Sequence, residues 1–216
     1  MRLLATMLMR STFTLGVLLL GASFGSAQTF TGAGFTFDDA TEDTFGLTSS
    51  TLTASGLNSD SFIQSITLTN LTHTYIGDTV FELYRESDGK FLDFIEFPLN
   101  RSANFNGTYT LVASQTLPTI AGVSAGQPTA FDVPSGTYAM SDYVSGQPDG
   151  PRLDFSPFNG VDLNGEWTLL VGDFGVGDTG AIGSWSLNFG TNPVPEPATM
   201  AVLGLGAAAL LRRRRK

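Results

Sequence analysis

The chain has 216 residues, a formal net charge of −9 at pH 7 and no cysteine, so it forms no disulfide and has no thiolate nucleophile or metal ligand. Seven of its 11 basic residues lie in the two end segments, and 19 of its 20 acidic residues lie in residues 28–192. This central part, with four basic and 19 acidic residues, disfavours nucleic acid as a partner and favours cations.

Residues 1–27 have the features of a secretory signal peptide. Arg2 and Arg10 supply positive charge, and an apolar stretch follows at residues 13–22. Small residues precede the expected cleavage site after Ala27. We therefore expect export, with signal peptidase as the first partner. A retained membrane helix is the alternative, which the short apolar stretch disfavours.

Residues 28–192 are expected to form one domain, because this length suffices to bury a sizeable core. No long helical pattern is present. Short runs of β-branched and aromatic residues are instead separated by Gly, Asn, Asp and Ser, which is typical of strands. The predicted strands lie at residues 61–71, 78–86, 90–97, 166–173 and 183–189, with another after the turn in NFNGTYTLV, at residues 108–112.

Alternation within these runs predicts which side chains face the core. In GSWSLNF, Trp185, Leu187 and Phe189 are expected inward and the polar residues between them outward. Turns are expected at residues 87–89 and at Asn106-Gly107. About eight to ten strands of this kind predict an antiparallel β-sandwich.

Residues 112–160 are rich in Gly, Pro, Ser and Ala, and we interpret them as long loops on a fixed scaffold. Tyr and Phe residues between 131 and 158 are expected to be exposed in these loops. Such rings would stack on sugars, which makes a polysaccharide one candidate ligand.

The last 24 residues combine a proline-rich stretch, an apolar run and a basic end. The apolar run, residues 198–211, would span about 21 Å as a helix, which is short against a bilayer core of about 30 Å. We expect a single short transmembrane helix; a plain C-terminal anchor is the alternative. The proline-rich motif is Val194, Pro195, Glu196 and Pro197, and the basic membrane stop is Arg212, Arg213, Arg214 and Arg215.

These three parts, in this order, resemble a PEP-CTERM sorting tail. The resemblance implies that an exosortase recognises the motif in the membrane and that the tail is removed. It also implies a Gram-negative bacterium that makes exopolysaccharide. The protein would then be a membrane-tethered precursor first and a cell-surface or extracellular protein afterwards.

Two stretches of residues 28–192 resemble the P domain (P/Homo B domain) of subtilisin-like proprotein convertases. They are ITLTNLTHTYIGDTVFELYRESDG and LDFSPFNGVDLNGEWTLLVGDFGVGDTGAIGSWSLNFG. The resemblance covers about residues 30–190 and implies a jelly-roll β-sandwich. Thr79 departs from the leucine usual in that family, and residues 85–89 depart from its usual turn. The shared motifs lie at residues 73–78, 158–160, 164–167, 177–180 and 185–187.

Acidic residues in glycine-rich loops make calcium a candidate cofactor, since calcium prefers roughly six to eight oxygen ligands. GDFGVGDTG places Asp173 and Asp178 five residues apart, and Asp78 ends a neighbouring loop in the family pattern. We hypothesise that these three side chains help bind one calcium ion. The alternative is that Asp78 and Asp178 cap turns.

Catalytic interpretations find less support in the residues. A serine-protease triad needs a histidine base, and His73 is the only histidine. We expect it to be an imidazole hydrogen-bonded at a strand end. Paired carboxylates would suit a glycosidase. The candidates, none in a recognisable glycosidase motif, are Asp38 with Asp39, Glu42 with Asp43, and Asp173 with Asp178.

The sequence therefore predicts a non-catalytic binding or structural module on an exported surface or matrix protein. Exopolysaccharide and another surface protein are its candidate partners. The alternative is an accessory or relic domain of a secreted subtilisin-like serine protease, because the family resembled by residues 28–192 accompanies such enzymes.

Overall fold

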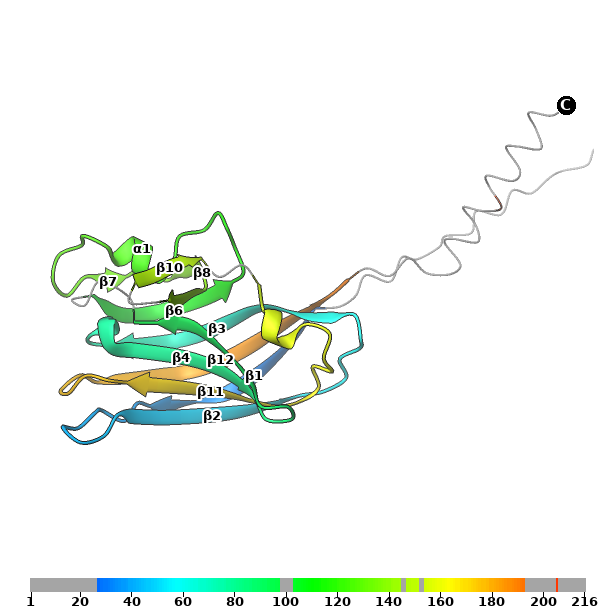
Figure 1. The fold of residues 1–216 in the computed structure, drawn as a ribbon, viewed down its shortest axis with the longest axis horizontal. Coiled ribbons are helices and arrows are strands. Elements are labelled where there is room, and N and C mark those ends of the chain that lie inside the picture. Colours follow the sequence, from blue (N-terminus) through cyan, green and yellow to red (C-terminus); the bar gives the residue numbers. More distant parts are fainter. Residues whose placement is uncertain (1–26, 98–102, 145–146, 152–153, 193–204, 206–216) are drawn as a thin grey trace, which may run out of the picture. The chain divides into compact units, whose positions relative to one another are not determined.

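The computed structural model describes residues 27–97, 103–144, 147–151 and 154–192 together with Leu205 (Figure 1). Three short helices are η1 (Ile76–Asp78), α1 (Ile120–Ser124) and η2 (Ser156–Phe158). The strands are β1 (Gln28–Thr36), β2 (Gly46–Ala54), β3 (Ser61–His73), β4 (Thr79–Arg85), β5 (Lys90–Glu96), β6 (Asn104–Val112), β7 (Asp132–Val133), β8 (Gly136–Ala139), β9 (Ser141–Val144), β10 (Gln147–Pro151), β11 (Gly165–Asp173) and β12 (Gly180–Thr191).

These strands form two main sheets, so the prediction of an all-β fold is confirmed. One sheet has the order β1-β12-β3-β6-β7, with β8 also paired to β6. The other has the order β2-β11-β4-β5, and β9 pairs with β10 separately. Successive strands often belong to different sheets, because β1 and β3 lie in the first sheet whereas β2 and β4 lie in the second.

A single hydrophobic cluster lies between the sheets, and alternation along the strands builds it. Trp185 and Leu187 on β12, and Trp167 and Leu169 on β11, are fully buried, as their spacing predicts. Ser184, Ser186 and Asn188 remain partly exposed on the other face of β12. Full burial of each large apolar side chain stabilises the fold by roughly 1.5–3 kcal/mol.

The prediction of purely antiparallel pairing is wrong at one edge. Both β7 and β8 run parallel to β6, with Asn104 opposite Asp132 and Leu111 opposite Tyr138. A parallel pair needs a long connection that returns the chain to the end at which the first strand began. The segment between β6 and β7, which contains α1, is such a connection.

Two local predictions also need correction. Residues 112–160 are not only loops, since they contain α1, β7, β8, β9, β10 and η2. Asn106-Gly107 is not a turn but continues β6, where both residues pair with β3. The irregular position in this pairing is on β3, at Asn70, whose φ of 52° is positive.

The Tyr and Phe side chains between residues 131 and 158 whose burial the structure describes do not form the exposed sugar-stacking surface expected of them. Tyr138, Phe155 and Phe158 are buried in the core, and Phe131 packs against it. The expectation of exposure rests on the Gly-, Pro-, Ser- and Ala-rich composition of residues 112–160, which is typical of loops. Pairing of β8 with β6 turns Tyr138 inward, and η2 closes Phe158 over the ring of Trp167.

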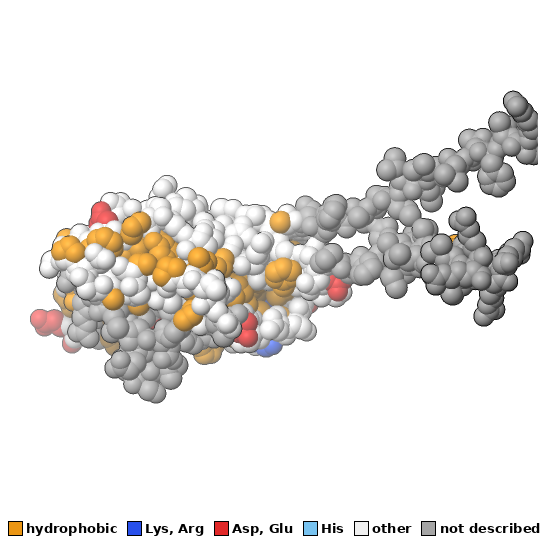
Figure 2. All heavy atoms as spheres, turned by 90° about the horizontal axis from the view of Figure 1, so that it is seen from above, with side chains coloured by type: hydrophobic (Ala, Val, Ile, Leu, Met, Phe, Trp, Pro, Cys, Tyr) orange, Lys and Arg blue, Asp and Glu red, His pale blue; other side chains and the backbone are white. Residues whose placement is uncertain are grey.

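Acidic side chains are scattered over the face drawn in Figure 2, whereas Lys and Arg cover only a small area of the part coloured by type. The predicted signal peptide lies outside the described residues, apart from Ala27, and so does the predicted transmembrane helix, apart from Leu205. Across the described residues, no helix has the length and apolar character needed to cross a membrane.

Candidate functional site

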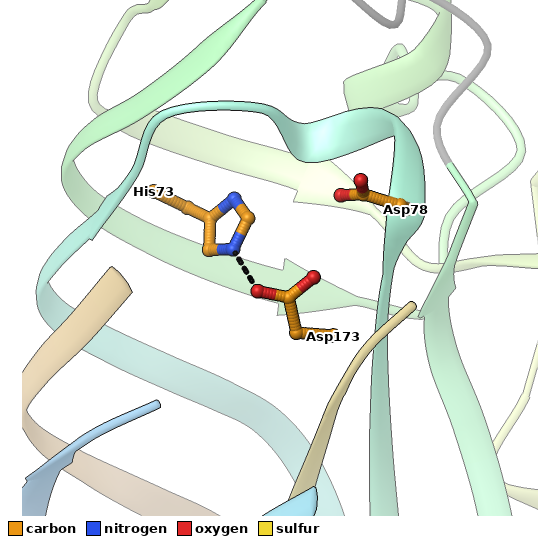
Figure 3. Close-up of side chains that lie close together, drawn as sticks. All are labelled: His73, Asp78 and Asp173. Atoms are coloured by element: carbon orange, nitrogen blue, oxygen red, sulfur yellow. Dashed lines mark hydrogen bonds and ion pairs between the residues drawn. The ribbon is translucent and has the colours of Figure 1, made fainter. Parts of the chain in front are cut away.

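Three polar side chains meet at one end of the sandwich, where three elements end (Figure 3). His73 is the last residue of β3, Asp78 the last of η1 and Asp173 the last of β11. One possible ligand atom from each lies within 4.8 Å of the others. Strand register places Asp173 beside Asp78, because Asp173 pairs with Thr79, the residue that follows Asp78. His73 comes from the other sheet, where β3 ends.

His73 is buried and both of its ring nitrogens are engaged. Its Nδ1 accepts a hydrogen bond from the Tyr75 amide at 3.2 Å, and its Nε2 lies 3.2 Å from Asp173 Oδ2. The ring also packs against Phe37, with centroids 5.9 Å apart. An accepting Nδ1 carries no proton, so the proton lies on Nε2 and is donated to Asp173. The hydrogen bonds thus assign a neutral imidazole with a fixed tautomer.

This geometry limits the chemistry of His73. In the described structure neither ring nitrogen has a free lone pair to take a proton from a substrate or to bind a metal ion. The imidazole instead donates to a carboxylate, and this role orients Asp173.

Asp173 is only 1% exposed, yet both of its carboxylate oxygens have partners. Oδ2 accepts from His73, and Oδ1 accepts from the Gly175 amide at 3.1 Å. A buried carboxylate with hydrogen bonds at both oxygens avoids most of the cost of an unpaired buried charge. Asp173 is therefore the fixed centre of this group.

Asp78 is half-buried, and its two oxygens are less well satisfied. Its Oδ1 is buried and has no hydrogen-bond partner. Burial, followed by the negative charges of Asp173 and Asp178, raises the pKa of Asp78 to about 6. An unpartnered carboxylate oxygen beside two further acids has a strong tendency to take up a proton or a cation.

Two glycines leave the room that this group needs. A Cβ at Gly175 would lie 1.8 Å from Asp78 Oδ2, and a Cβ at Gly180 would lie 2.5 Å from the His73 ring. Glycine at these two positions of GDFGVGDTG therefore allows the backbone to pack closely against Asp78 and His73.

The structure places the predicted calcium ligands unevenly. Asp78 and Asp173 come together, whereas Asp178 lies outside the group of three and accepts a hydrogen bond from the Thr74 hydroxyl at 3.0 Å. The sequence suggests Asp39 only as a glycosidase carboxylate beside Asp38, whereas its carboxylate accepts from the Gly177 amide at 3.0 Å in the loop of the predicted calcium ligands. Its position in the sequence, in an acidic stretch before β2, gave no sign of this contact.

A second carboxyl pair lies elsewhere, on β4 and β5, where Glu82 is opposite Asp93. Burial, then the charge of Asp93 and the hydrogen bond between them, raises the pKa of Glu82 to about 7. A carboxyl group with a raised folded-state pKa stabilises the fold below its unfolded pKa, and this contribution is lost as the pH rises through the folded value. Glu82 thus lowers stability above about pH 7 relative to pH 4.

Glu82→Gln is therefore expected to raise the free energy of unfolding at pH 8 by about 1 kcal/mol, allowing for solvent screening of this half-exposed group. The gain should disappear near pH 4, where wild-type Glu82 is protonated in both states. Urea unfolding at pH 4 and pH 8 measures the difference. Glu166→Gln, at an exposed site on β11, is the matched control. Equal effects of the two variants at pH 8 would contradict the assignment.

A model of the PEP-CTERM protein-sorting motif matches residues 193–216. The match includes the predicted motif at 194–197 and the basic stop at 212–215, which lie outside the described residues. It implies an exported surface protein that an exosortase processes. No curated protein matches the chain, and no family match supports the P-domain resemblance of residues 28–192.

Proposed function

We propose that the protein is a non-catalytic binding or structural component of a bacterial cell surface or extracellular matrix. The sorting motif at residues 193–216 is the main support for this proposal, because such a motif marks a protein for processing by an exosortase. The acidic, disulfide-free β-sandwich supplies the exposed module. Its partners are an exopolysaccharide or another surface protein, and the host is a Gram-negative bacterium.

We further propose that the sandwich is a jelly roll of the P-domain type. In support, the eight longest strands fall into two sets of four, β1-β12-β3-β6 and β2-β11-β4-β5. Four antiparallel pairs, β1–β12, β2–β11, β3–β6 and β4–β5, follow one another along the chain and lie alternately in the two sheets. This is the arrangement of two Greek keys in a jelly roll. As a P domain, the module would stabilise a partner and would not itself cleave peptides.

Calcium remains our proposed cofactor at the loop end of the sandwich. In support, Asp78 Oδ1 is buried without a partner, and the carboxylates of Asp78 and Asp173 converge. His73 does not fit as a ligand because both of its nitrogens are engaged. Asp78 and Asp173 would therefore be ligands and Asp178 would contribute from the loop, with the ion fixing the loop between β11 and β12.

Mass spectrometry of the protein isolated from its host tests the proposed export and processing of the chain. We expect the mature chain to begin at Gln28 and to lack the residues beyond the sorting motif. Replacing Pro195, Glu196 and Pro197 together by alanine should leave the tail attached, and Pro193→Ala is the control. An intact N-terminus, or unchanged processing of the triple variant, would overturn the proposal.

A further inference from the structure

A pocket of about 480 Å³ lies at the opposite end of β3 from the His73 group. It is bordered by the first residues of β3, by η2 (the yellow coil in Figure 1) and by the residue that follows β12. Since β3 has 13 residues, the two ends of the sandwich are roughly 40 Å apart. The pocket is thus independent of the candidate calcium group, and its volume suits a small ligand or one or two units of a polymer.

Phe62 gives this pocket an exposed aromatic surface. Its side chain is 40% exposed, whereas 12 of the 15 phenylalanines of the described residues are buried or partly buried. The ring lies over Gly190 on the neighbouring strand, where a Cβ would come within 2.6 Å of its Cζ. One part of the ring is therefore held by the backbone of β12, and the rest borders the pocket in a fixed position.

A second side chain of β3, at a β-bulge, lines the same pocket. Ile63 pairs with Phe189 and Ser65 with Asn188, so Gln64 is the extra residue on β3. Its exposed amide lines the pocket two residues from Phe62. Bulges often re-aim side chains beside binding sites.

Polar groups complete the rim of the pocket above a buried apolar floor. Asp60, Asp154 and Asn159 line it, and all three are exposed. Asp154 Oδ1 accepts from the Ser156 amide at 3.1 Å, which fixes the carboxylate at the start of η2. The described residues that line the pocket include carboxylates, amides and hydroxyls but no Lys or Arg.

From this combination we propose that the pocket binds a neutral carbohydrate. A pyranose ring presents C–H groups on its faces and hydroxyls at its edge, so it suits an aromatic surface flanked by carboxylate and amide groups. An anionic polymer is disfavoured by Asp60 and Asp154 and by the acidic body. The inference rests on the proposed function, because it places the polysaccharide contact at a specific site.

Native gel electrophoresis of the mature protein in gels containing dextran, xylan or laminarin tests this site, with alginate as the anionic comparison. We expect at least one neutral polymer to retard the wild type and alginate to have no effect. Phe62→Ala should weaken the retardation about tenfold, as loss of one aromatic contact does. Gly190→Ala, which displaces the ring without removing it, should also weaken it, whereas Phe62→Tyr should retain it.

Phe45→Ala is the matched control, because Phe45 is 64% exposed and does not line the pocket. If Phe62→Ala does not fold, Gln64→Ala and Asp154→Asn carry the test from exposed positions. If these variants leave the retardation unchanged, the pocket is not the carbohydrate-binding site, while the proposed surface function stands. Absence of any retardation of the wild type would also overturn it. Failure of export would instead overturn the proposed function, whatever the gels show.

Discussion

Asp173→Asn is expected to lower the free energy of unfolding by about 2–3 kcal/mol, because it leaves buried hydrogen-bond donors facing each other. The carboxylate accepts from both the His73 Nε2–H and the Gly175 amide. An asparagine has only one accepting oxygen, so its NH₂ group must face one of these donors. Transferring the imidazole proton to Nδ1 only moves the conflict to the Tyr75 amide.

Thermal unfolding in EGTA measures this effect, and a fall of about 5–10 °C in Tm is expected for a domain of this size. Asp178→Asn is the matched control, since an asparagine oxygen still accepts from the Thr74 hydroxyl. That control should change Tm by only a degree or two. Similar Tm values for wild type and Asp173→Asn would show that the buried pair is not formed.

The tautomer can be observed directly, because His73 is the only histidine in the chain. Long-range ¹H–¹⁵N correlation NMR should show one neutral imidazole protonated at Nε2 in the wild type. In Asp173→Asn, this signal should shift or divide between tautomers. An imidazolium, or an Nδ1–H tautomer, in the wild type at pH 7 would contradict the hydrogen-bond assignment.

The sequence predicts strands well where burial alternates strictly along the chain. Trp185 and Leu187 were assigned to the core from a period of two, and both are fully buried. Alternation fails in residues 112–160 because β7 and β8 are only two and four residues long, too short to show a period. Their existence depends on parallel pairing with β6, a non-local contact.

Local turn chemistry misled the prediction at Asn106-Gly107. This dipeptide favours a tight turn in a hairpin, but here Asn106 donates to Asp132 Oδ2 and Gly107 lies close to Ser135. Both contacts come from residues more than 25 positions later in the chain. Tertiary contacts therefore outweighed the local preference, as they often do in strands.

The candidate site was predictable in its acids but not in its arrangement. Asp78 and Asp173 were identified from glycine-rich loops, yet the partner that fixes Asp173 is His73, 100 positions away. Sequence reasoning placed that histidine at a strand end without finding its partner. His73 lies on β3 in one sheet and Asp173 on β11 in the other, so their contact depends on the register within each sheet and on the packing of the two sheets. Neither is visible in a single sequence.

Asp78→Asn is expected to have opposite effects on stability with and without calcium. In EGTA, the raised pKa means that the wild-type carboxylate favours folding when protonated, below its unfolded pKa of about 3.8, and loses this contribution as the pH rises through about 6. The asparagine carries no charge, so the variant should gain about 1 kcal/mol, or about 3 °C in Tm, over the wild type at pH 7.5 and nothing near pH 3.5.

Calcium at 10 mM should reverse the order. A site with Kd of about 10⁻⁴ M would stabilise the wild type by about 2.7 kcal/mol, whereas the variant has lost a ligand and should gain much less. Magnesium at equal concentration controls for screening, and Asp43→Asn, at an exposed acid in the loop before β2, controls for net charge. If calcium and magnesium raise the Tm of the wild type equally, the calcium proposal fails. If Asp78→Asn is no more stable than the wild type in EGTA at pH 7.5, the causes given for the raised pKa of Asp78 fail instead. Burial of this carboxylate and its repulsion by Asp173 and Asp178 would then not destabilise the folded state.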